Sequence, residues 1–268
     1  YKRQVFDTTP YTILVVDDNP DMTDFLKRTF EGYFKRIIIA GDGGEALQLV
    51  RSHVPDIIVS DVMMPRMNGY KLCKTIKEDI NISHIPVILL TARDDRQSQI
   101  SGYKNGADGY LSKPFEVEML MELIRNRLKN REYTKKRYLN AGLIPTPEES
   151  TISLTDETFL IKLNSIIQEN IENSNLGIQF ICQEVGLGRS SLYNKLKALT
   201  GMGANEYISK LRIEKAITLI SGTDMPFSEI AEKTGFTTPS YFSTAFKQYT
   251  GETPSQYKER KKKGLADK

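Results

Sequence analysis

Short apolar runs alternate with helical patterns over the first half of the chain. The apolar runs are bounded by polar residues, and they lie at Ile13–Val16, Ile57–Ser60, Val87–Leu90 and Tyr110–Ser112. Runs of this kind between helices are typical of buried parallel strands. Helices are predicted over Pro20–Phe30, Gly43–Ser52, Gly69–Glu78, Arg96–Asn105 and Glu116–Lys129. The pattern therefore predicts an α/β domain with five strand–helix units, folded as a doubly wound five-stranded parallel sheet.

From Asp156 onward the pattern becomes helical, and a repeat appears within it. Ile181, Gly186 and Ser191 recur 49 positions later as Ile230, Gly235 and Ser240. Each copy reads as helix, glycine turn, helix, which is the pattern of a helix-turn-helix whose second helix enters the DNA major groove. A helical spacer over Ala204–Leu219 separates the copies. The alternative is an all-α bundle that binds protein, or nothing, because this geometry also occurs outside DNA-binding proteins.

The predicted organisation has five parts. They are an N-terminal linker over 1–10, the α/β domain over 11–130, a charged Pro-containing linker over 131–155, an all-α domain with two helix-turn-helix motifs over 156–260, and a basic tail over 261–268. The linker is expected to begin as an extension of the preceding helix.

Composition limits the number of domains and the cellular location of the protein. The 268 residues suffice for two ordinary domains, and the net charge of +3 says little about partners. Cys73 and Cys182 have neither metal-ligand nor disulfide spacing, which favours a cytoplasmic location. No apolar run approaches the ~20 residues that span a bilayer, so no membrane contact is expected. The chain begins at Tyr1 rather than Met, which suggests an excerpt from a longer protein, for which an inner-membrane sensor is one candidate.

Chemically active groups follow the predicted strands. Asp17 and Asp18 follow the first run, Asp61 follows Ile57–Ser60, Thr91 follows Val87–Leu90, and Lys113 follows Tyr110–Ser112. In an open α/β sheet, binding and catalytic sites lie at the carboxyl ends of the strands. The carboxylates are suitable ligands for Mg²⁺. Asp61 is the candidate nucleophile, which would become an aspartyl phosphate. Thr91 can donate a hydrogen bond to a phosphoryl oxygen, and Lys113 can place a positive charge beside the same group. Alternatively, each Asp merely caps the helix that follows it.

The segments VVDDNPDM, SDVMMPRMNG, LLTA and GYLSKPF resemble the receiver domain of bacterial response regulators, over about residues 11 to 130. The resemblance implies a flavodoxin-like sheet, Asp61 as the phosphoacceptor, and Mg²⁺ held by Asp17, Asp18, Asp61 and the Met63 carbonyl. It also implies that Thr91 and Tyr110 form a switch pair, two residues that rearrange when Asp61 is phosphorylated. Lys113 matches the lysine of the family's phosphorylation site, and the Lys113–Pro114 bond is expected to be cis. Neither His53 nor His84 has a phosphodonor context, so the donor histidine is expected elsewhere.

Two recognition helices are predicted, over Arg189–Leu199 and Thr238–Tyr249. Leu192, Leu196 and Leu199 are expected to pack in the first, and Tyr241, Phe242 and Phe246 in the second. The candidates for DNA contact are Arg189, Ser190, Asn194, Lys195 and Lys197 in the first copy, and Thr237, Thr238, Ser240, Ser243, Thr244 and Lys247 in the second.

The segments LGRSSLYNKLKALTG and FSEIAEKTGFTTPSYFSTAFKQYTGETPSQYKE resemble AraC-type transcription factors. Both resemblances together imply a phosphorylation-controlled transcription regulator that binds duplex DNA, receives phosphate from a histidine kinase, forms a homodimer when phosphorylated, and has RNA polymerase as a candidate partner. The domain order resembles the C-terminal part of a hybrid two-component sensor, many of which control polysaccharide-utilisation genes. The alternatives are a standalone response regulator with a separate kinase and an Asp-nucleophile phosphatase. Turnover of a small substrate is not expected.

Overall fold

The computed structural model describes residues 6–92, 106–140 and 153–266. The chain divides into two compact units, Tyr1–Arg137 with Pro147–Glu157, and Tyr138–Thr146 with Thr158–Lys268. The predicted helix over Arg96–Asn105 lies outside the described residues.

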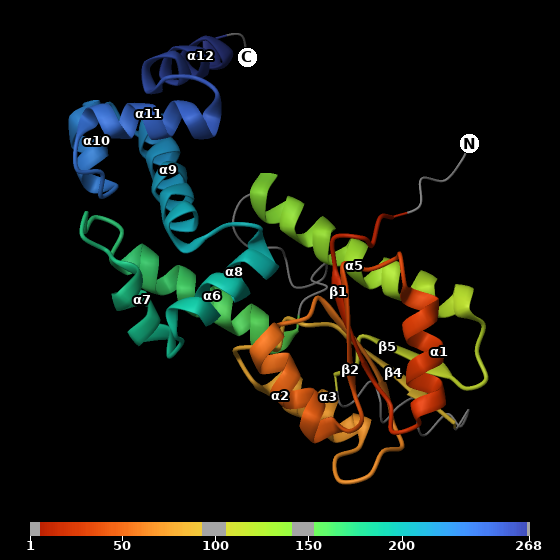
Figure 1. Cartoon of the computed structure of the whole chain (residues 1–268). Coiled ribbons are helices and arrows are strands. Elements are labelled where there is room, and N and C mark those ends of the chain that lie inside the picture. Colours follow the sequence, from red (N-terminus) through yellow and green to blue (C-terminus); the bar gives the residue numbers. More distant parts are fainter. Residues whose placement is uncertain (1–5, 93–105, 141–152, 267–268) are drawn as a thin grey trace, which may run out of the picture. The chain divides into compact units, whose positions relative to one another are not determined.

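The first unit is built on a five-stranded sheet, shown with its helices in Figure 1. Its strands are β1 (Thr12–Val16), β2 (Arg36–Ala40), β3 (Ile57–Asp61), β4 (Val87–Thr91) and β5 (Gly109–Ser112). All neighbouring strands are parallel, in the order β2-β1-β3-β4-β5. The predicted doubly wound parallel sheet is confirmed.

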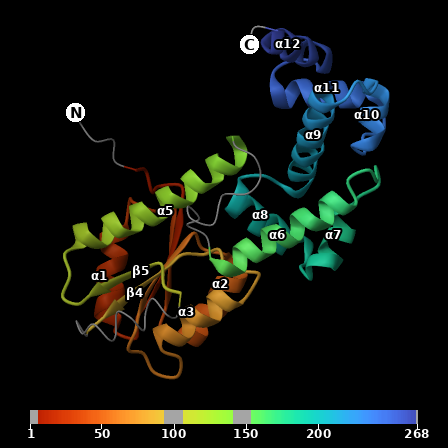
Figure 2. The same ribbon diagram turned by 180° about the vertical axis from the view of Figure 1, so that it is seen from behind.

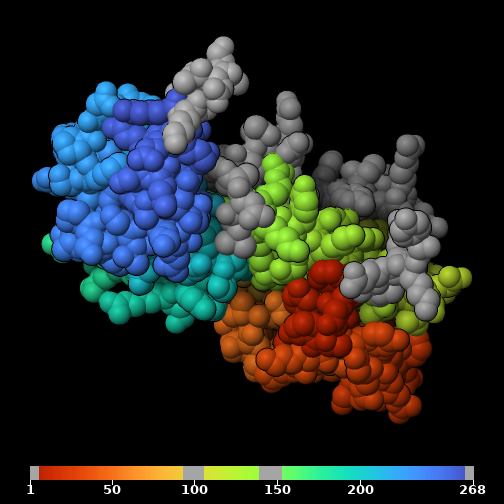
Figure 3. Space-filling view, turned by 90° about the horizontal axis from the view of Figure 1, so that it is seen from above, coloured from red at the N-terminus to blue at the C-terminus, as the bar shows by residue number. Residues whose placement is uncertain are grey.

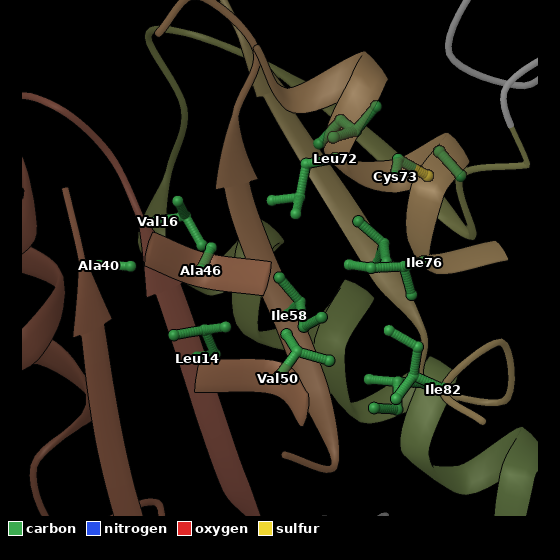
Figure 4. Close-up of a cluster of buried hydrophobic side chains, with 14 of the residues drawn as sticks. Leu14, Val16, Ala40, Ala46, Val50, Ile58, Leu72, Cys73, Ile76 and Ile82 are labelled. Carbon is green, nitrogen blue, oxygen red and sulfur yellow. The ribbon is translucent and has the colours of Figure 1, made fainter. Parts of the chain in front are cut away.

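Helices cover both faces of this sheet, as Figures 1 and 2 show from opposite sides. They are α1 (Pro20–Phe30), α2 (Gly43–His53), α3 (Gly69–Glu78) and α5 (Val117–Asn140). Alternate strand residues point to opposite faces, so Leu14 and Ile58 pack with α2 and α3 (Figure 4). Ile13 and Val59 pack instead against α1 and α5. Both strand faces are therefore buried, which explains the continuous apolar runs.

Polar caps fix where three of these helices begin. Asn19, Asp42 and Asn68 precede α1, α2 and α3, and each accepts a hydrogen bond from a backbone N–H of the first turn. Helix α5 continues to Asn140, beyond the predicted end at Lys129. No Gly or Pro occurs between Val117 and Asn140 to stop it. The first ten residues of the predicted linker are consequently helical.

The second unit is helical and contains the two repeated motifs. Its helices are α6 (Leu154–Glu169), which begins in the first unit, α7 (Ile178–Val185), α8 (Arg189–Thr200), α9 (Ala204–Gly222), α10 (Phe227–Lys233), α11 (Pro239–Thr250) and α12 (Pro254–Ala266). Helices α7 and α8 form copy one, and α10 and α11 form copy two. The long helix α9 joins the copies (Figures 1 and 2). The predicted duplicated helix-turn-helix is confirmed.

Within the described residues, none of the helices is both long and apolar enough to cross a membrane.

Candidate functional site

One rim of the sheet gathers the polar groups that follow the strands. Asp17 follows β1, Asp61 ends β3, Thr91 ends β4 and Lys113 follows β5. The register pairs Asp61 with Leu90, and Thr91 with Ser112, so the ends of β3, β4 and β5 are nearly level. The structure thus brings these groups to one edge, as predicted.

Lys113 joins the two buried carboxylates of this rim. Its Nζ lies 2.8 Å from Asp17 Oδ2 and 2.5 Å from Asp61 Oδ1. Asp17 is 3% exposed and Asp61 is 6% exposed. Buried ions need partners of opposite charge, and here one ammonium serves two carboxylates. These three side chains together therefore carry excess negative charge.

Backbone groups hold the remaining carboxylate oxygens. The Asn19 N–H donates to Asp17 Oδ1 at 2.9 Å, and the Met63 N–H donates to Asp61 Oδ2 at 2.6 Å. Gly69 begins α3 directly beside the end of β3, where a Cβ atom would overlap the Asp61 carbonyl oxygen. The absence of a side chain at Gly69 thus allows α3 to start close to the acceptor.

Burial and neighbouring charge shift the pKa values of Asp61 and Lys113 in opposite directions. Burial raises the pKa of Asp61, and the Lys113 ammonium only partly offsets the rise. Burial disfavours the Lys113 ammonium, but its hydrogen bonds to Asp17 and Asp61 prevail and raise its pKa. Lys113 is consequently held in the charged form that can contact an anionic group.

The predicted magnesium ligands are only partly gathered. Asp18 is exposed, and no group of three or more His, Cys, Asp or Glu side chains in the described residues is arranged to hold a metal. The donor chemistry nevertheless fits Mg²⁺, which binds one or two carboxylates and keeps several waters. Asp17 and Asp61 could supply those carboxylates, because Lys113 balances the charge of only one of them.

The two residues of the predicted switch pair lie on β4 and β5, the two strands that follow the acceptor strand β3 in the sheet. Thr91 is 2% exposed, and Tyr110 is half-buried on β5. The Tyr110 hydroxyl lies 3.2 Å from the Tyr70 hydroxyl of α3. No local pattern indicates Tyr70, since this contact joins residues 40 positions apart through the packing of α3 on the sheet. The cis Lys113–Pro114 bond implied by resemblance is confirmed.

Both helix-turn-helix turns use a glycine in the left-handed conformation, Gly186 with φ 74° and Gly235 with φ 72°. Most of the predicted DNA-contacting residues are exposed on α8 and α11 or immediately before α11; these are Arg189, Ser190, Lys197, Thr237, Thr238, Ser240, Thr244 and Lys247, while Asn194 and Ser243 are half-buried. Figure 3 shows the surface of the C-terminal helices in blue.

Lys195 is predicted to contact DNA, but the structure places it in the core instead. It is 0% exposed, and its Nζ lies 5.1 Å from the centre of the Phe159 ring of α6. A side chain in this position cannot reach phosphate. Lys195 follows Leu192 by three residues and precedes Leu199 by four, so helical spacing already places it on the packed face of α8.

Tyr241 is a second correction. The sequence predicts Tyr241 in the core with Phe242 and Phe246; those two are fully buried, but Tyr241 is 55% exposed. Its position directly before Phe242 turns it away from the packed stripe. The packing expected for Leu192, Leu196 and Leu199 is confirmed.

A buried aspartate at a strand end, with a second carboxylate and a lysine beside it, is the arrangement expected of a receiver domain, and the second unit carries two helix-turn-helix copies. Residues 13–125 match the family model of the response regulator receiver domain, and residues 181–260 match that of a helix-turn-helix domain.

Three curated relatives are similar to this chain. Histidine kinase P4 from Formosa agariphila is 41% identical over 249 residues, 93% of this chain. The DNA-binding response regulator MtrA from Mycolicibacterium smegmatis is 36% identical over 51% of the chain, and the response regulator MprA from Mycobacterium sp. strain KMS is 36% identical over 57%. The chain spans 18%, 58% and 70% of the lengths of these relatives, respectively. It belongs to the response regulators of two-component systems, with an AraC-type output domain.

Proposed function

We propose that Asp61 accepts a phosphoryl group from a histidine kinase and that this phosphorylation controls sequence-specific binding of the second unit to duplex DNA. The observation that carries the proposal is the pair of buried carboxylates, Asp17 and Asp61, around the Lys113 ammonium at the carboxyl edge of the sheet. The excess negative charge makes the site receptive to a cation, and the ammonium is placed to contact an anion.

In the transfer step, an Asp61 carboxylate oxygen attacks phosphorus of a phosphohistidine. A P–O bond forms, the P–N bond breaks, and the imidazole leaves and takes up a proton. Lys113 contacts Asp61 Oδ1 and is therefore positioned to stay beside the phosphoryl oxygens. Asp17, Asp18, Asp61 and the Met63 carbonyl would hold Mg²⁺, which when bound neutralises charge on the transferring group.

Signal transmission is assigned to Thr91 and Tyr110. A phosphoryl group on Asp61 would add acceptor oxygens that the Thr91 hydroxyl can bind, and Tyr110 would then move from its contact with Tyr70. Among the described elements, the moving face comprises β5 and α5. We propose that this face forms the contact between two copies of the chain.

The kinase is proposed to lie in the same polypeptide. The 41% identity to histidine kinase P4 extends over 93% of this chain, across both domains, which supports a hybrid origin. A standalone regulator with a separate kinase is the second candidate, supported by the similarity to MtrA. The reading frame upstream of Tyr1 distinguishes them. Met63, rather than a carboxylate, stands two residues after Asp61, which disfavours the phosphatase alternative.

DNA binding is proposed for the exposed polar residues of α8 and α11, with RNA polymerase as a further candidate partner. Arg189 and Asn194 are proposed to read base edges, and Lys197 is proposed to contact phosphate.

Asp61→Asn tests the acceptor. The chain is incubated with a small phosphodonor and Mg²⁺, and its intact mass is measured. One added phosphoryl group is expected on the parent chain and none on Asp61→Asn, because the amide is not a nucleophile. Asp24→Asn on the exposed surface of α1 is the matched control and should label like the parent. Undiminished labelling of Asp61→Asn would contradict the assignment.

A further inference from the structure

Helix α9 is shared by the two helix-turn-helix copies. Near its start, the Tyr207 hydroxyl donates to Asn164 Oδ1 of α6 at 2.8 Å. Towards its end, Ile213, Ala216 and Ile220 belong to the apolar cluster of copy two. A shared helix sets the separation of the copies. Their relative rotation depends also on whether the copies touch each other beside it.

Arg212 provides such a contact at the middle of α9. Its Nη2 donates to the Asn173 carbonyl, in the loop between α6 and α7, at 2.7 Å. Its guanidinium carbon lies 6.0 Å from the centre of the Phe236 ring, in the turn of copy two. A guanidinium can donate at its edge while its face lies on a ring. The Arg212 side chain therefore connects the loop that precedes copy one with the turn of copy two. Figures 1 and 2 both show the α6–α7 loop beside α10.

Close backbone packing at Gly235 contributes to the same junction. A Cβ atom on Gly235 would overlap the Ile171 carbonyl oxygen and would lie 2.8 Å from Arg212 Nη2. At the matching Gly186 of copy one, no described atom lies within 4 Å of such a Cβ. Both glycines have positive φ, so the turn conformation accounts for both of them. Only Gly235 is also required by close contact. The second turn is packed against the end of α6, whereas the first turn is open.

We propose that this junction, formed by Arg212, Gly235 and the carbonyls of Ile171 and Asn173, fixes the angle between α8 and α11 and so selects the spacing of the two DNA segments that one chain can contact together. Arg212 and Gly235 are positioning residues that act through the recognition helices. The consequence for DNA rests on the proposed function, whereas the fixed angle belongs to the protein without DNA.

The physical basis is the avidity of two linked contacts. When both recognition helices meet their segments, the second contact is intramolecular and adds ~10²–10⁴ in affinity. A rigid junction loses this gain on a duplex with altered spacing. A loosened junction has a lower affinity for the best spacing, because binding must order it, but it tolerates other spacings.

The first test measures the junction without DNA. Distance labels are attached to non-natural amino acids at the exposed positions Glu184 of α7 and Glu229 of α10, in the full chain with its native cysteines. The parent should give one narrow distance distribution. Arg212→Met, which keeps the aliphatic stem, and Gly235→Ala should both broaden it.

Gly186→Ala is the matched control, since it introduces the same positive-φ strain without the clash and should stay narrow. Circular dichroism confirms folding of each variant. Should Gly235→Ala fail to fold, Arg212→Met decides alone. A folded Arg212→Met with the parent's narrow distribution would overturn the proposal.

The second test uses a duplex selected by the parent, with one to three base pairs inserted or removed between the contacted segments. The parent should lose ~10²-fold or more in affinity, and Arg212→Met ~10-fold or less. An unchanged spacing preference in Arg212→Met would also overturn the proposal. If the parent binds no duplex at all, the proposed DNA function fails, and the label distances still test the junction.

Discussion

At the scale of single residues, the two lysines near the middle of α8 lie in different environments. Lys195 is buried over the Phe159 ring, whereas Lys197 is exposed. Lys195→Ala is expected to lower the free energy of unfolding by ~2 kcal/mol or more, because it leaves a cavity. Lys195→Met keeps most of the side-chain volume and should cost less than Lys195→Ala. Urea denaturation measures both changes.

DNA titration separates the same two lysines by function. Lys197→Ala should leave the unfolding midpoint unchanged but weaken binding to all duplexes alike, with a salt slope reduced by about 1, if Lys197 contacts one phosphate. Lys195→Met should retain both the affinity and the slope. A loss of affinity in Lys195→Met as large as in Lys197→Ala would place Lys195 at the DNA rather than in the core.

At the scale of elements, the two recognition helices begin differently. The Thr238 side chain caps α11 by accepting from the Tyr241 N–H at 3.2 Å, whereas Gly188, which precedes α8, has no side chain to cap that helix. Thr238→Ala is therefore expected to destabilise the chain by about 1 kcal/mol.

Thr237 is the natural comparison for this cap, because it is exposed one position earlier and lies outside the helix. Thr237→Ala should leave the urea midpoint of the chain where it is. Equal destabilisation by the two variants would mean that the cap contributes nothing specific to α11.

At the scale of the whole molecule, phosphorylation is expected to act by bringing two chains together. The acceptor and the recognition helices belong to different units. Dimerisation would make the second chain's DNA contact effectively intramolecular and raise affinity ~10²–10⁴-fold for an operator with two copies of the site. Sedimentation with and without a beryllofluoride phosphate mimic, alongside DNA titration, measures both effects.

Asp61→Asn serves as the control, since it should show neither the dimer nor the affinity gain with the mimic. A chain that stays monomeric with beryllofluoride yet binds DNA more tightly would instead indicate release of an inhibitory contact within one chain.

The sequence by itself determined the sheet, the rim of polar groups and the duplicated motif. Asp17, Asp61 and Lys113 could be placed together because polar residues directly after buried parallel strands must emerge at one edge. The repeat was visible because a helix-turn-helix keeps its glycine and apolar positions at fixed spacing. These features depend on local periodicity, which a single sequence displays.

Tertiary structure decided which side chains meet across elements. The contact of Lys195 with the Phe159 ring, the contact of Tyr70 with Tyr110, and the junction at Arg212 each join residues that no local pattern relates. Gly186 and Gly235 look equivalent in sequence, yet only Gly235 is packed against another chain segment. Such contacts depend on how whole helices pack, and packing is fixed only when distant apolar faces are buried together.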